Sequence, residues 1–156
     1  MTIPQKFQDK NLPLLESALH YQFTRKDLLI RALTRYAYTE EHSPDTDAHM
    51  DALATLGDAV IDLIVIESVI KSGEIEKGVI TTRKMDLVNM SALRDIGKAL
   101  DLEKYVFWGK GEVIQHVWTS GRVLAECVEA ILGAVYLDSD ITACRSVLAH
   151  LGLISG

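Results

Sequence analysis

The chain has 156 residues, of which 48% are hydrophobic and 24% are charged, and its formal net charge is −6. This length suits one domain with an ample apolar core, and the acidic balance argues against a protein that coats RNA through bulk positive charge. No apolar run approaches the roughly 18–20 residues that cross a bilayer, and the N-terminal segment lacks the apolar centre of a signal peptide. We therefore expect a soluble, cytoplasmic protein with no membrane partner.

Apolar residues recur at three- and four-residue spacing along most of the chain, which predicts an all-α helical bundle. A first short helix is expected after Pro13, with Leu14, Leu15, Ala18 and Leu19 on its apolar side. No segment alternates strongly enough to require a sheet.

A second, longer helix is predicted over the stretch TRKDLLIRALTRYAYTEE. Thr24 has the residue type of an N-cap, and Asp27 stands three positions later, as in a capping box. The polar run around Pro44 marks a loop after this helix.

The third predicted helix, residues 48–71, is apolar on almost every side, which is typical of a central buried helix. Ser91 is the expected cap of a later helix, and the glycine-broken stretch at residues 105–121 is expected to be an ordered connection. The other helices are expected at residues 79–88, 91–100, 122–137 and 141–151.

Acidic residues interrupt the third helix along one narrow stripe. Asp51, Ala54 and Asp58 stand at i, i+3 and i+7, so their side chains share a face. Gly57 directly precedes Asp58. Because glycine inside a helix costs about 1 kcal/mol relative to alanine, we expect another backbone to approach closely there.

A second acidic pair interrupts the apolar stretch LAECVEAILGAVYLD. Glu126 and Glu129 are neighbours on one helix face, and Gly133 follows one turn later. If the two helices cross, Asp58 meets both glutamates, and three carboxylates in an apolar setting need a cation. Magnesium or manganese, which prefer oxygen ligands, would suit this cluster and support phosphoryl-transfer chemistry.

The spacing alone leaves a simpler alternative open. Glu126 and Glu129 would then form the solvated edge of their helix, and Asp58 would pair with Arg83 or Arg122.

Several motifs in order resemble those of ribonuclease III. LATLGDAVIDLIV resembles the family's signature helix, and LAECVEAILGAVYLD resembles its second signature. Further matches are FTRKDLLIRALTRYAY, ITTRKMDLVN and the turn YVFWGKGE. The likeness covers about residues 14–148, so we expect residues 1–156 to be one ribonuclease III-like domain, similar to the short forms without a double-stranded-RNA-binding domain.

The resemblance implies an all-helical endonuclease domain that works in RNA processing as a homodimer. In the family, magnesium ions support hydrolysis of double-stranded RNA, leaving 5′-phosphate and 3′-hydroxyl ends. The implied partners of this chain are therefore double-stranded or structured RNA and a second copy of itself. The apolar residues Leu53, Leu56 and Ile61 favour the same assembly, because they are too apolar to remain exposed.

The resemblance also assigns candidate site residues. The family's metal-binding aspartate falls on Asp58 and its catalytic glutamate on Glu129, so these two are the expected catalytic residues. The expected metal ligands are Asp58, Glu126 and Glu129, with Glu126 in place of an aspartate. Asp51, which replaces a glutamate, is a candidate ligand or a residue that supports the ligands.

Two positions depart from the family pattern. Ala54 stands where a glutamate is usual, and it has no group that binds a metal. Lys77, next to Glu76, stands near another acidic position. Asp51 cannot replace the missing ligand, because it lies about 10.5 Å from Asp58 along the helix axis.

Arg83 and Lys84 fall where the family's helix contacts RNA phosphates, although a solvated basic helix face explains them equally well. We expect a phosphodiester hydrolase, a metal-dependent endoribonuclease weakened at Ala54. The alternative is a lapsed relative that serves as an RNA-binding or ribonucleoprotein subunit. A third class, a helical-bundle hydrolase of small phosphorylated molecules, fits the ordered motifs poorly.

Overall fold

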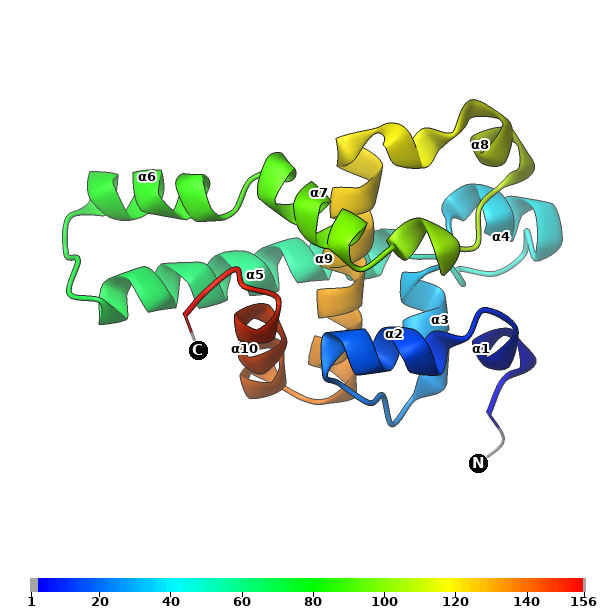
Figure 1. Ribbon diagram of the computed structural model, residues 1–156, viewed down its shortest axis with the longest axis horizontal. Coiled ribbons are helices and arrows are strands. Elements are labelled where there is room, and N and C mark those ends of the chain that lie inside the picture. Colours follow the sequence, from blue (N-terminus) through cyan, green and yellow to red (C-terminus); the bar gives the residue numbers. More distant parts are fainter. Residues whose placement is uncertain (1–2, 156) are drawn as a thin grey trace.

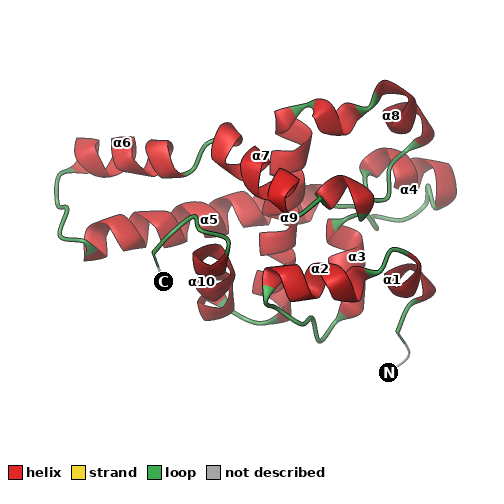
Figure 2. Cartoon of the chain, in the orientation of Figure 1, coloured by secondary structure: helices red, strands yellow, loops and turns green. Residues whose placement is uncertain are grey.

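Residues 3–155, which a computed structural model describes, are almost entirely helical (Figure 1 and Figure 2). With η for a short 3-10 helix, the elements are α1 (Gln5–Asp9), α2 (Leu12–Leu19), α3 (Lys26–Ala32), α4 (Tyr36–His42), α5 (Asp51–Lys71), α6 (Lys77–Leu87), α7 (Met90–Ala99), η1 (Leu102–Lys104), α8 (Lys110–Gln115), η2 (Val117–Thr119), α9 (Gly121–Asp138) and α10 (Ile141–His150). The predicted all-α fold is confirmed. None of the helices in this part of the chain is long and apolar enough to span a membrane.

The two longest helices, α5 and α9, cross at the centre of the molecule (Figure 1). Each contributes a glycine to the crossing. A Cβ at Gly57 would overlap the backbone carbonyl oxygen of Glu129, and a Cβ at Gly133 would overlap that of Leu53. The expected close approach of another backbone to Gly57 is therefore confirmed, and it brings the two acidic stripes together.

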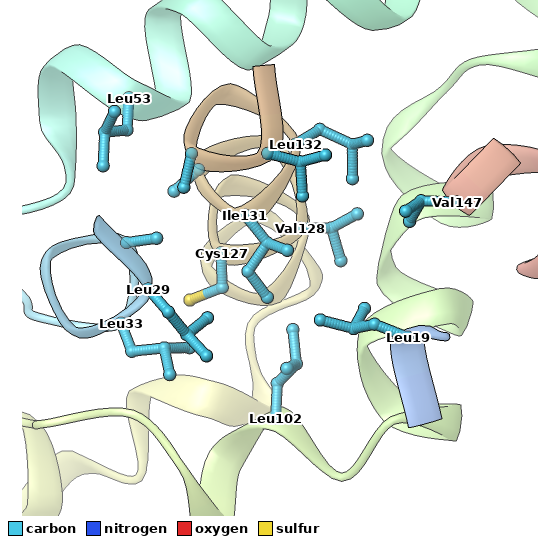
Figure 3. Close-up of a cluster of buried hydrophobic side chains, with 14 of the residues drawn as sticks. Leu19, Leu29, Leu33, Leu53, Leu102, Cys127, Val128, Ile131, Leu132 and Val147 are labelled. Carbon is cyan, nitrogen blue, oxygen red and sulfur yellow. The ribbon is translucent and has the colours of Figure 1, made fainter. Parts of the chain in front are cut away.

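Helix α9, not α5, is the most enclosed helix of the bundle. Ten of its 18 residues are buried, against seven of 21 in α5. Figure 3 shows Cys127, Val128, Ile131 and Leu132 of α9 within a cluster of apolar side chains. The labelled neighbours come from several elements, namely Leu19, Leu29, Leu33, Leu53, Leu102 and Val147. The prediction that the α5 segment is the central helix is wrong, because one face of α5 stays exposed.

The exposed apolar residues of α5 are not the predicted ones. Leu53 and Ile61 are 2% and 0% exposed, because they belong to the core of the same chain, and Leu56 packs against that core. Leu63 and Ile70 are instead 55% and 52% exposed. The argument for a dimer from Leu53, Leu56 and Ile61 is therefore wrong.

The predicted second helix is two helices, α3 and α4, with a break at residues 33–35. In the break, Phe107 donates its backbone N–H to the carbonyl of Leu33 at 2.8 Å and accepts that of Arg35 at 3.2 Å. The isolated bridge between Thr34 and Phe107 is the only extended pairing in residues 3–155. Phe107, 72 residues after Arg35 in the chain, thus takes the backbone groups that would have continued the helix.

Thr24 does not cap α3, which begins at Lys26. The carboxylate of Asp138 accepts the backbone N–H groups of Thr24 and Arg25 at 2.9 and 2.8 Å, and the hydroxyl of Tyr21 at 2.6 Å. Asp138 thus satisfies donors at the start of α3 and ties this segment to the end of α9.

Most predicted boundaries agree with the structure. The helices expected at residues 79–88, 91–100, 122–137 and 141–151 are α6, α7, α9 and α10, and their ends differ by no more than two residues. The cap of α7 is Asn89, not Ser91, because the Asn89 side chain accepts the backbone N–H of Ala92 at 2.8 Å. On α2, Leu15 and Leu19 are buried as predicted, but Leu14 is exposed.

Candidate active site

The crossing of α5 and α9 places their acidic side chains around two adjoining surface hollows. One hollow, of about 510 Å³, is bordered by Asp58 and Glu129 and also by Asp62 and Lys84. The other, of about 520 Å³, reaches Ala54 and Asp51 near the start of α5. The side chains that border both hollows are Asp58, Arg122, Glu126 and Glu129.

Asp58 and Glu129 are in direct contact across the crossing. The pKa of Glu129 is raised from 4.5 to about 8, first by burial and then by its hydrogen bond with Asp58 and the negative charges of Asp58, Glu126 and Asp62. Two carboxylates in contact cannot both ionise freely, so a hydrogen bond between them requires a proton on one of them, and the raised pKa places it on Glu129. Glu129 is therefore not part of a solvated helix edge, and the backbone approach at Gly57 is what brings the pair together.

Glu126 borders the same hollows but is held by two arginines. Arg35 Nη1 lies 3.4 Å from its Oε2, and Arg122 Nε lies 3.6 Å from its Oε1. Arg35 also donates from Nε to Oε2 of Glu112 at 3.0 Å. The three acids therefore have different surroundings: Glu129 is hydrogen-bonded to Asp58, whereas Glu126 lies against two arginines.

Comparison with known proteins adds to this geometry. The family model described as Ribonuclease-III-like matches residues 25–153. The chain belongs to the ribonuclease-III-like family. It is 35% identical over 142 residues to a ribonuclease 3 of Shewanella sp. (strain ANA-3), which covers 90% of this chain and 60% of that protein. A ribonuclease 3 of Oleidesulfovibrio alaskensis is 35% identical over 138 residues, with coverages of 88% and 60%. The chain thus spans about 60% of the length of these curated relatives.

A solved structure agrees with this assignment. The nuclease domain of ribonuclease III from Campylobacter jejuni superimposes with a TM-score of 0.82 at 27% identity, covering 90% of this chain and 95% of that one. The chain is therefore a ribonuclease-III-like nuclease domain.

In this ribonuclease-III-like domain, Lys84 and Arg83, the two basic residues predicted to bind RNA, have different partners. Lys84 Nζ lies 3.4 Å from Asp62 Oδ2 at the edge of the acidic hollow. Arg83, one residue earlier on α6, donates from Nη1 to the hydroxyl of Ser72 at 3.2 Å, beyond the end of α5. Neither Arg83 nor Arg122 takes Asp58 as its partner, so the simpler alternative for Asp58 is wrong.

The two departures from the family pattern lie in different surroundings. Ala54 borders the acidic hollow, so the site itself lacks the carboxylate that a glutamate at this position would supply. Lys77 is the first residue of α6, about 10 Å along that helix from Lys84, which is the residue that reaches the hollow. Asp51 is exposed at the start of α5 and lies 3.8 Å from Nδ1 of His49.

Sequence reasoning missed three residues of this site. Asp62 stands one turn after Asp58, so its i, i+4 spacing was a readable signal. Arg35 and Glu112 gave no such signal, because they lie 91 and 14 residues from Glu126 along the chain. Only in the folded protein does Arg35 contact both Glu126 and Glu112.

The residues present suit a divalent cation in part. Within residues 3–155, no three acidic, histidine or cysteine side chains already converge as a metal cage. The hydrogen-bonded carboxyls of Asp58 and Glu129 nevertheless supply oxygen donors, and a cation would replace the proton on Glu129. Glu126 has its oxygens on arginines, so the ligand set of Asp58, Glu126 and Glu129 remains a prediction.

Proposed function

We propose that this nuclease domain is a divalent-metal-dependent endoribonuclease that hydrolyses double-stranded or structured RNA in RNA processing. The observation that carries the proposal is the Asp58–Glu129 carboxyl pair at the α5–α9 crossing, beside a hollow that opens to solvent. Two carboxylates held together beside a half-buried site repel each other unless a cation or a proton compensates them. Membership in the ribonuclease-III-like family supports the assignment of that cation to phosphodiester hydrolysis.

Asp58 and Glu129 are the proposed catalytic residues and metal ligands, with Glu126 as the third ligand. A bound magnesium or manganese ion would activate water and neutralise charge on the phosphate. Glu129 must lose its proton before both carboxylates can bind a cation. Metal binding should therefore strengthen as the pH rises through the Glu129 pKa of about 8. Asp51 is proposed to support the ligands from the start of α5.

Lys84 and Arg83 are proposed to contact RNA phosphates. Lys84 is half-buried at the edge of the acidic hollow, where a phosphate near the carboxylates would come within its reach. Arg83 is exposed on α6 and would contact a phosphate farther along the duplex. Such contacts need positive charge and carry no base specificity.

The domain is also proposed to form a homodimer through the exposed side of α5. Ala59, Leu63, Ile66 and Ile70 stand at four-, three- and four-residue spacing, so they form one apolar stripe, of which Leu63 and Ile70 are more than half exposed. The ribonuclease III nuclease domain of C. jejuni has a region involved in dimer formation. Obligate interfaces of this kind often bury about 2,000 Å² or more in total.

Light scattering of the wild type and of Leu63→Glu tests this assembly. The wild type should be a dimer at micromolar concentration, and Leu63→Glu should shift it to monomers because a charge would be buried in the interface. A matched change on the exposed side of α2, Leu14→Glu, should leave the dimer intact. A monomeric wild type would contradict the proposal.

The activity test is incubation of duplex RNA with manganese at high protein concentration. The wild type should produce internal cuts, and Asp58→Asn should reduce the rate by about 100-fold or more, at least as much as the loss of a residue that only supports a ligand. Absence of cleavage by a folded dimer would count against the enzyme. Hydrolysis of nucleoside triphosphates without duplex cleavage would assign the carboxyl pair to a different substrate class.

A second candidate function is that of an RNA-binding or ribonucleoprotein subunit without cleavage. Ala54, which removes one carboxylate, and the two arginines on Glu126 favour it. In that case, wild type and Asp58→Asn would bind duplex RNA with similar affinity, and neither would cut it.

A further inference from the structure

Arg35 is fixed on several sides, although it lies just before the short helix α4. Its backbone N–H donates to the carbonyl of Phe107 at 3.2 Å, and its guanidinium stacks over the ring of Trp108 at 5.8 Å. Its Nε donates to Oε2 of Glu112 at 3.0 Å, and only 16% of the side chain is exposed. Glu112 is itself fixed, because its Oε1 accepts the backbone N–H of Gly109 at 3.1 Å.

The two arginines on Glu126 hold different oxygens and are anchored to different degrees. Arg35 Nη1 reaches Oε2, and Arg122 Nε reaches Oε1. Arg122 stands four residues before Glu126 on α9, and its side chain is 77% exposed. An exposed ion pair at i, i+4 spacing is weak, so Arg122 can leave readily, whereas Arg35 is held in place by Glu112.

The two arginines also differ in the charge that they bring to the site. Arg35 is paired with Glu112, so the two together add no net charge near the carboxylates. Arg122 has Glu126 as its only recorded ionic partner in residues 3–155, so its charge opposes the entry of a cation. A carboxylate that binds a metal usually keeps a hydrogen-bonding partner on its outer side, which fixes its orientation.

We propose that Arg35 is a positioning residue for metal binding: it retains Oε2 of Glu126, while the exposed Arg122 gives up Oε1 to the incoming divalent cation. This inference rests on the proposed function and assigns opposite effects to two arginines that contact the same carboxylate. Loss of Arg35 weakens metal binding, because Glu126 is no longer oriented. Loss of Arg122 does not weaken it, because a competing positive charge is removed.

Calorimetric titration with manganese, together with the manganese-induced rise in melting temperature, tests these opposite effects. Arg35→Gln should raise the dissociation constant for manganese by about 10–100-fold. Arg35→Lys, which keeps the charge but cannot bridge Glu112 and Glu126 as a planar fork, should fall between Arg35→Gln and the wild type. Arg122→Ala should bind manganese at least as tightly as the wild type.

Two further variants separate positioning from folding. Arg35→Gln leaves the half-buried Glu112 carboxylate without its partner, so the double variant Arg35→Gln/Glu112→Gln removes that charge and should fold while still binding manganese weakly. Arg145→Gln removes a half-buried arginine that pairs with Glu67 outside the acidic hollows, and it should leave the titration unchanged.

The outcomes distinguish this inference from the proposed function. A wild type that binds manganese no better than Asp58→Asn would overturn both. A wild type that binds manganese, with a folded double variant that binds it equally tightly, would overturn only the role of Arg35. If Arg122→Ala bound manganese more weakly than Arg35→Gln, the roles of the two arginines would be reversed. That result would also overturn the inference.

Discussion

Helix α5 has two long neighbours that it meets in different ways. Against α9 the backbones are in contact at Gly57 and Gly133, and Asp58 and Glu129 are hydrogen-bonded through their carboxyl groups. Figure 1 shows α6 running alongside α5, and α6 contributes no buried residue. Their contact includes an ion pair between Lys84 and Asp62 at 3.4 Å. The proposed catalytic acids thus lie where α5 and α9 are tightly packed, and the proposed RNA contacts lie on the more exposed helix α6. Chemistry that needs precise positioning is placed where the packing leaves least freedom.

The largest difference between these two contacts should appear when a methyl group is added to each. Gly57→Ala should lower the free energy of unfolding by about 3 kcal/mol or more, because its Cβ overlaps a backbone carbonyl that cannot turn away. Gly78→Ala on α6 meets nothing nearer than Glu76 Oε1 at 3.8 Å, and it should stabilise the protein by up to about 1 kcal/mol. Urea unfolding measures both, and equal effects would contradict the comparison.

The carboxyl pair at the crossing should make the metal-free protein less stable as the pH rises from weakly acidic to neutral values. The pKa of Glu129 is raised in the folded protein to about 8 from 4.5, so folding is favoured when Glu129 is protonated. The free energy of unfolding should therefore fall as the pH rises from about 5 to about 8, and Glu129→Gln should remove that fall. Urea unfolding without metal across this range measures it. The same slope in both proteins would show that the pair is not the cause.

Repair of the Ala54 departure should raise activity by a moderate amount. Ala54 borders the acidic hollow one turn before Asp58, so Ala54→Glu adds a carboxylate without touching Gly57. Duplex cleavage with manganese should rise about tenfold, which corresponds to ~1.4 kcal/mol of transition-state stabilisation. Gln8→Glu, at an exposed position of α1 outside both hollows, controls for added charge. Slower cleavage by Ala54→Glu would indicate that the existing acids already form an efficient site.

The smallest effects on RNA binding and stability are expected for substitutions on helix α6. In an Asp58→Asn background, Lys84→Gln should weaken duplex RNA binding a few-fold at all sequences and reduce the salt dependence by about one phosphate contact. The free energy of unfolding should change by less than about 1 kcal/mol, because the Lys84–Asp62 pair is partly exposed. Binding titrations at several salt concentrations measure the first effect. An unchanged salt slope would remove Lys84 from the RNA contacts.

Local patterns in the sequence were sufficient for most of the helices and for part of the site. Helical spacing located α6, α7, α9 and α10 to within two residues, because one buried stripe per helix needs only local periodicity. Gly57 beside Asp58 predicted a close crossing, and the matching stripe at Glu129 and Gly133 identified the partner. Those features lie within a few residues of one another in the chain, so a single sequence contains them.

Only the tertiary structure decided which groups compete for each partner. The pairing of Phe107 with residues 33–35 divided a helix that local propensity had predicted as continuous. The link from Glu112 through Arg35 to Glu126 joins residues from three separate parts of the chain, and it placed Glu126 on arginines rather than beside Asp58. Burial of Leu53 and exposure of Leu63 likewise depend on which side of α5 the other helices cover. A pattern along one helix identifies an apolar or acidic face, but the neighbours that meet that face are set by packing of the whole chain.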